Sequence, residues 1–226
     1  MKNLLKTDFP LFYGIKRHKI DVPTEHTDAD CFDLDDKTVS MIVDFEQGNV
    51  SFYNNNNEEV EVIGYEKYVN GLSGTSFEKG RKRCDFIITV TNGSEKSMFM
   101  LNEQTSTLET TENLKKVILD KDKNVLFPGG KYEKAETQLA ESLRTLLAVP
   151  GIAEYLSEFK NRLCLMSYVI NHKERISGAA SAFANRYRLV EARETGEDGA
   201  LLDNTEINRM HFEYRRISHD YKFTLD

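Results

Sequence analysis

The chain has no tryptophan, only four prolines and only three cysteines among its 226 residues. Cys31, Cys84 and Cys164 are odd in number, lie far apart and form no CxxC pair, which argues against a zinc ribbon or a disulfide scaffold. No run of 18 apolar residues is present, so we expect no membrane-spanning segment. The first ten residues lack the long apolar segment of a secretory signal, and we therefore expect a cytoplasmic protein with free thiols.

Several motifs that bind nucleotides or carry out hydrolysis are also missing. There is no GxxxxGK[ST] or GxGxxG loop for nucleotide phosphates, no GxSxG nucleophile turn and no HExxH zinc motif. The five histidines are scattered, and a cysteine nucleophile would need a histidine partner that the sequence does not place. The sequence therefore gives no signal for these enzyme classes.

The composition is typical of a globular protein with ample core, at 39% hydrophobic and 30% charged residues. The 37 acidic and 30 basic residues leave a net charge of −7, which does not favour strong non-specific binding of nucleic acid. One local basic cluster, residues 81–83, stands directly before a predicted strand. It suits either a phosphate contact or a solvated strand entry.

Residues 81–105 contain two apolar segments around a turn signal. Residues 84–91 are rich in β-branched and aromatic side chains and predict a strand, and residues 97–105 predict a second. Asn92-Gly93 between them favours a turn, because both residues tolerate a positive φ. Apolar residues occupy both faces of both strands, which is typical of a sheet that is covered on both sides.

One carboxylate lies near the outer end of each strand, Asp85 in the first and Glu103 in the second. A loop of three or five residues would place them directly opposite each other on one face, with Cβ atoms about 5 Å apart. A loop of two or four would place them on opposite faces, because a one-residue slip flips a strand. Two carboxylates so close repel each other unless a divalent cation or a basic residue lies between them. The alternative is that both are solvated charges at strand ends.

A family resemblance rests on two segments, KRCDFII at 82–88 and FMLNEQT at 99–105. They resemble the core of the PD-(D/E)XK nuclease superfamily, in which a CDF-like strand is often followed by a strand ending in Glu-x-Lys and then by a helix. The resemblance implies a restriction-endonuclease-like core in which Asp85 and Glu103 hold Mg²⁺ and a lysine assists the attacking water. Thr105 stands at the lysine position, so the motif is incomplete.

Residues 131–147 predict the clearest helix of the chain, with one apolar stripe. Its opening, KAETQL at 134–139, resembles the KAxxQL that follows the active strand in some members of the superfamily. In those members a lysine or glutamine of this helix can enter the site, which implies that Lys134 and Gln138 could stand in for the missing lysine. The two are four residues apart and so stacked on one helix face. The alternative is a solvated lysine and a surface glutamine.

The other predicted elements complete a single α/β (α+β) domain over residues 1–226. We expect a mixed central β-sheet flanked by helices, with the helices of 131–160 on one face. Its strands are predicted within 38–64, 84–105 and 162–170, the segments 38–46 and 49–53 pairing as a hairpin. Residues 65–72 predict a short helix, and residues 110–119 have helical spacing.

We further divide the domain into an irregular N-terminal segment (1–36), a nuclease-like core (38–170) and a C-terminal extension of helix and strands (174–226). Residues 174–190 are rich in alanine and other small residues, which allow close packing against another helix or subunit. A protein partner or a homo-oligomer contact is therefore predicted through this segment.

Two functions remain open at this point. The first is a Mg²⁺-dependent nuclease-like protein that hydrolyses phosphodiesters in nucleic-acid processing or defence, by analogy of fold. Its catalytic residues would be Asp85, Glu103, Lys134 and Gln138, with Asp85 and Glu103 as metal ligands and Glu66 or Glu78 as candidates for a third ligand. The second is a catalytically degenerate binding or scaffold subunit of a larger complex, which Thr105 and the acidic net charge favour.

Overall fold

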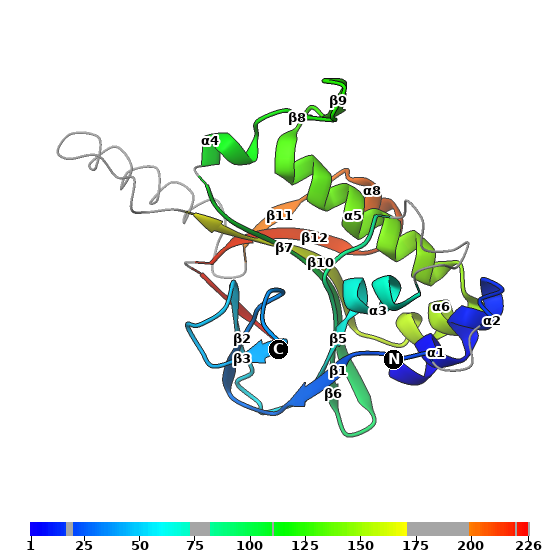
Figure 1. Ribbon diagram of the computed structural model, residues 1–226. Coiled ribbons are helices and arrows are strands. Elements are labelled where there is room, and N and C mark those ends of the chain that lie inside the picture. The colour runs from blue at the N-terminus through cyan, green and yellow to red at the C-terminus, as the bar shows by residue number, and fades with distance from the viewer. Residues whose placement is uncertain (17–19, 73–81, 110, 171–198, 220, 226) are drawn as a thin grey trace.

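A seven-stranded mixed sheet forms the centre of the protein, which is described here from a computed structural model covering residues 1–16, 20–72, 82–109, 111–170, 199–219 and 221–225. The strand order is β1-β5-β6-β7-β10-β12-β11 (Figure 1). The strands are β1 (Thr24–Thr27), β5 (Glu59–Gly64), β6 (Phe86–Asn92), β7 (Glu95–Glu109), β10 (Asn161–Ile170), β11 (Ala200–Leu202) and β12 (Glu213–Ser218). The predicted α+β class with a large mixed sheet flanked by helices is confirmed.

Strand directions change half-way across this sheet. β1, β5, β6 and β7 pair antiparallel in turn. β10 then pairs parallel to β7, and β12 pairs parallel to β10. A parallel pair needs a crossover connection, and the long helix α5 (Gly130–Leu147) lies on the crossover between β7 and β10.

Helices cover one face of the sheet (Figure 1). α5 is amphipathic and buries Ala135, Leu139, Leu143 and Leu146, and each buried leucine contributes about 1.5–3 kcal/mol to stability. Around it lie shorter helices: α1 (Lys2–Lys6), α2 (Asp8–Phe12), α3 (Tyr65–Gly71), α6 (Pro150–Ser157) and α8 (Glu206–Arg209). In the described part of the chain, no helix has the length and apolar character needed to cross a membrane.

A second, four-stranded sheet covers the other face. Its order is β13-β4-β2-β3, from β13 (Lys222–Thr224), β4 (Val50–Tyr53), β2 (Cys31–Leu34) and β3 (Ile42–Val43). Phe32, Phe52 and Phe223 of this sheet pack in one apolar core with Ile88 and Met100 of the central sheet. The central sheet therefore has a separate apolar core on each face, as the apolar residues on both sides of its strands predicted.

A small two-stranded sheet projects from the body at the start of α5 (Figure 1). It pairs β8 (Ile118–Leu119) with β9 (Val125–Phe127) and follows the single-turn helix α4 (Thr111–Leu114). The predicted helix over 110–119 is therefore right only for its first turn, because the chain turns into a strand at Ile118.

The N-terminal third differs most from the prediction. Residues 1–36 are not irregular, because α1, α2, β1 and β2 lie there. Residues 38–53 do not join the central sheet, and β3 and β4 do not pair with each other, because both pair with β2 in the second sheet. β12 and β13 likewise join different sheets rather than forming a pair. The predicted helix at 174–190 lies outside the described residues.

Candidate functional site

The pairing of β6 with β7 sets the position of the two carboxylates. Only Gly93 and Ser94 separate the strands, yet a bulge between Val90 and Thr91 shifts the register by one residue. Phe86 then pairs with Asn102, and the Asp85 amide donates to the Asn102 carbonyl at 3.1 Å. This is the register that a loop of three or five residues predicted for the two strands, and it ends at Phe86 and Asn102, one residue before Asp85. The loop is shorter than that, and the bulge restores the register.

Glu103 lies on the face that carries α5. Side chains alternate along a strand, and Leu101 of β7, two residues before Glu103, belongs to the apolar core beneath the helices. Asp85 lies in a bend directly before β6, and its neighbour Cys84 packs in that same core. Phe86 of β6 and Met100 of β7 lie on the opposite face and pack in the core beneath the second sheet.

Burial dominates the electrostatics of the pair. Asp85 is 8% exposed and Glu103 is 5% exposed. Loss of water raises the pKa of Asp85 to about 7, although the Gln104 amide donates to its Oδ2 at 2.7 Å and opposes this shift. Burial, followed by the charge of Asp85, raises the pKa of Glu103 well above its ordinary value. The two groups resist ionising together unless a positive charge joins them.

One oxygen of Glu103 has no hydrogen-bond partner within the residues that the structure describes. Its Oε2 is buried and accepts no hydrogen bond from any described residue. Buried polar atoms in folded proteins are nearly always hydrogen-bonded, and an exception calls for an explanation such as an ion or a catalytic role. Glu103 Oε2 is therefore a buried acceptor whose partner is not among the described residues.

Lys134 of α5 is the cation that acts on both carboxylates, since its charge lowers the pKa of Asp85 and of Glu103. It comes from the second turn of the helix and is exposed. Gln138 lies one turn further along, and its Nε2 donates to the backbone carbonyl of Arg83 at 2.8 Å. Gln138 therefore fixes the chain two residues before Asp85. Its Oε1 is buried and has no partner among the described residues.

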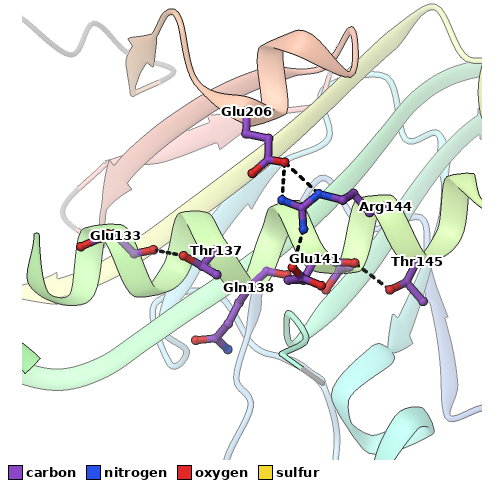
Figure 2. Close-up of polar contacts among 8 residues, drawn as sticks. Glu133, Thr137, Gln138, Glu141, Arg144, Thr145 and Glu206 are labelled. Atoms are coloured by element: carbon purple, nitrogen blue, oxygen red, sulfur yellow. Dashed lines mark hydrogen bonds and ion pairs between the residues drawn. The ribbon is translucent and has the colours of Figure 1, made fainter. Parts of the chain in front are cut away.

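The other polar side of α5 is used for packing. Arg144 forms ion pairs with Glu206 of α8 and with Glu141 of its own helix. Figure 2 shows Gln138 leaving the helix on the side away from Glu206. The helix is thus fastened to α8 by one side and presents Lys134 and Gln138 to the start of β6 by the other.

Thr105 occupies the position where the resemblance expects lysine, on the same face as Glu103. Its hydroxyl donates to the Ser167 carbonyl of β10 at 3.4 Å. Two further acidic groups influence the pair: Asp36, which follows β2, and Glu66 in α3 both raise the pKa of Asp85 and of Glu103. Asp36 was not predicted as a site residue, because only the long-range fold brings its segment here. Glu78 lies outside the described residues.

The donor set fits a hard divalent cation. Mg²⁺ prefers oxygen ligands and commonly takes one or two carboxylates, filling its remaining positions with water and substrate phosphate. Asp85 and Glu103 supply two such carboxylates. In the described ranges no three His, Cys, Asp or Glu side chains gather into a metal-holding group. A cation here would therefore depend on this pair and on non-protein ligands.

Comparison with known proteins adds no relative: no family model, curated protein or solved structure matches the chain.

Proposed function

We propose that the protein is a Mg²⁺-dependent nuclease-like phosphodiesterase whose site is centred on Asp85 and Glu103. The observation that carries the proposal is the buried pair of carboxylates, Asp85 directly before β6 and Glu103 in β7, with Glu103 Oε2 unpartnered among the described residues. A buried like-charge pair costs stability, and groups with strongly shifted pKa values cluster at functional sites. A cytoplasmic setting and a role in nucleic-acid processing or defence belong to the same proposal.

The residues around the pair have separate roles in this proposal. The Gln104 amide holds one Asp85 oxygen in place, and Gln138 fixes the preceding backbone through Arg83. Lys134 supplies the positive charge that partly offsets the two carboxylates. A bound Mg²⁺ would supply a nucleophilic hydroxide and stabilise charge that develops on the phosphate.

The order of elements supports the same function. Asp85 directly before β6, Glu103 in β7 and Lys134 in the second turn of α5 come in this order along the chain, with α4, β8 and β9 between β7 and α5. The PD-(D/E)XK resemblance implies this order of strand, strand and helix. We therefore extend the proposal to a restriction-endonuclease-like core built on β6, β7 and α5.

A second function is favoured by Thr105. Its neutral hydroxyl bonds to the backbone of β10 and cannot replace the lysine that would assist an attacking water. A chain that keeps the fold and the carboxylates but lacks this cation would bind without cleaving. The second proposal is thus a degenerate nuclease-fold binding or scaffold subunit, with the segment 174–190 as a candidate for the contact with a protein partner or a second copy.

Cleavage of plasmid DNA and of RNA in Mg²⁺ or Mn²⁺ separates the two functions. The nuclease proposal expects cleavage by the wild type, its loss in Glu103→Gln, and its retention in Glu154→Gln, which changes an exposed carboxylate of α6. The scaffold proposal expects an inactive wild type, with Thr105→Lys as the variant that restores the missing charge. Cleavage that survives Glu103→Gln would place the chemistry elsewhere and end the first proposal.

A further inference from the structure

The β8–β9 sheet and its flanks form an exposed projection, residues 115–127, which we call the β8–β9 arm. The arm carries four lysines and two aspartates, in a chain whose net charge is −7. Its four lysines, Lys115, Lys116, Lys121 and Lys123, are all exposed. Asp120 is occupied in the turn, where its Oδ1 accepts the amides of Asp122 and Asn124 at 2.9 and 2.8 Å. The arm therefore presents a net positive charge to solvent.

Exposed apolar side chains accompany these lysines. Val117, Leu119, Val125 and Leu126 are between 47% and 60% exposed. They are among the few large apolar side chains that the described chain leaves open to solvent. Because these lysine and aliphatic side chains are exposed, they do not stabilise the fold by burial. Both kinds of side chain are therefore available to a partner.

Two contacts fasten the base of the arm to the candidate site. Gly130, the first residue of α5, has φ +70° and packs so closely that a Cβ would lie 2.4 Å from the Leu114 carbonyl oxygen. Lys82, three residues before Asp85, lies over the Phe127 ring with its Nζ 4.3 Å from the centroid. Lys134 follows Gly130 by four residues, about one helical turn. The arm is thus anchored both to the strand entry that carries Asp85 and to the helix that carries Lys134.

We propose that the β8–β9 arm is the surface by which this protein holds duplex DNA beside the carboxylate pair, an inference that rests on the proposed nuclease-type function. A two-stranded ribbon fits the major groove of B-form DNA, and lysines contact phosphate without reading sequence. Aliphatic side chains can enter between base steps or contact thymine methyl groups. The positive charge of the arm complements the negative charge of DNA, whereas the net charge of the whole chain, −7, does not. The substrate class is therefore double-stranded DNA, bound with little sequence preference.

The test is the binding of a fluorescein-labelled duplex of mixed sequence to the full chain, by fluorescence anisotropy in Ca²⁺ over a series of salt concentrations. Lys121→Glu/Lys123→Glu should weaken binding at least about tenfold and lower the slope of log K against log salt by roughly two. The matched control is Lys6→Glu/Lys16→Glu, which makes the same charge change at exposed lysines in and after the N-terminal helices. This control should bind as the wild type does. Circular dichroism confirms that both variants are folded.

Other outcomes distinguish this inference from the function on which it rests. Duplex affinity that is equal in the arm variant and the control would overturn the role of the arm, whatever the carboxylates do. Binding of anionic phospholipid vesicles that depends on the arm, without duplex binding, would overturn it as well. A wild type that binds duplex through the arm yet binds no Mn²⁺ by calorimetry would instead contradict the metal site and leave the arm in place.

Discussion

The two faces of β7 differ in how their buried polar side chains are hydrogen-bonded. On the face beneath the second sheet, Gln104 is bonded at both ends of its amide. Its Nε2 donates to Leu34 at 3.2 Å and its Oε1 accepts from Asn49 at 3.3 Å. On the face beneath α5, the adjacent residue Glu103 is as deeply buried and carries an ionisable group, and one of its oxygens has no partner in the described part of the chain.

The difference separates a polar group that joins two sheets from one on which the proposed function depends. A neutral amide with partners on both ends joins β7 to the second sheet and stabilises the fold. A buried carboxylate near another one does the reverse, since burial raises the pKa of both groups and the charge of Asp85 raises the pKa of Glu103 further. Such an arrangement is kept where a ligand compensates for it, as a divalent cation would here.

The largest change in stability should come from the apolar part of the α5 face. Leu101 is fully buried, two residues before Glu103, and pairs with Ile87. Leu101→Ala should lower the free energy of unfolding by about 2–5 kcal/mol, because it leaves a cavity beneath the helix. Urea denaturation measures this loss. An effect under about 1 kcal/mol would show that this part of the face is not tightly packed.

Neutralising Asp85 should raise the free energy of unfolding rather than lower it. The pKa of Asp85 is raised to about 7 in the folded protein, so the folded state binds its proton more tightly than the unfolded chain does. Stability from this group is complete below about pH 4 and is lost as the pH rises to about 7. Asp85→Asn should therefore raise the free energy of unfolding at pH 8, in metal-free buffer, by roughly 2–4 kcal/mol.

Chemical denaturation at pH 5 and at pH 8 checks the sign of this effect. The gain from Asp85→Asn should be present at pH 8 and much smaller at pH 5. Asp21→Asn is the matched control, because Asp21 is an exposed carboxylate, and it should show little change at either pH. A destabilised Asp85→Asn at pH 8 would mean that the carboxylate is satisfied by the protein itself.

The amide on the other face should behave as an ordinary structural group. Gln104→Ala leaves the Leu34 carbonyl and the Asn49 amide without their partner and should cost about 1–3 kcal/mol, independently of pH between 5 and 8. The same denaturation series measures it. A pH-dependent loss would show that the two faces are coupled through the Gln104 backbone amide, which donates to Asp85.

The smallest effect should come from Lys134. Its charge lowers the pKa of both carboxylates, but the side chain is exposed and water screens the interaction. Lys134→Met should raise the pKa of Asp85 further and lower stability at pH 8 by about 0.5 kcal/mol or less. Side-chain carboxyl NMR titration measures the pKa, with Lys116→Met in the arm as the control that leaves it unchanged.

The sequence predicted best what depends on local pattern. The hairpin of β6 and β7, the helix α5 and the buried strand β10 follow from periodicity and turn residues close in the chain. The strands β6 and β7 also pair in the predicted register, although a bulge rather than the loop length sets it. The pairing ends at Phe86 and Asn102, so the opposition of Asp85 and Glu103 stays a prediction.

What the sequence did not predict depends on pairing between distant segments. β13 near residue 223 pairs with β4 near residue 52, and no local pattern brings these segments together. β5 alternates like an exposed edge strand, yet β1 pairs along its edge, and Val60 and Val62 are buried in the core beneath the second sheet. Asp36 approaches the carboxylate pair for the same reason, because the second sheet places the end of β2 there.

Calorimetric titration of Mn²⁺ or Mg²⁺ into the metal-free protein tests the central claim most directly. We expect one site in the wild type at pH 8, an affinity roughly tenfold lower at pH 6, where Asp85 with a pKa of about 7 is mostly protonated, and no binding in Glu103→Gln. A wild type that takes up no cation at pH 8, or a Glu103→Gln variant that binds as tightly as the wild type, would contradict the account.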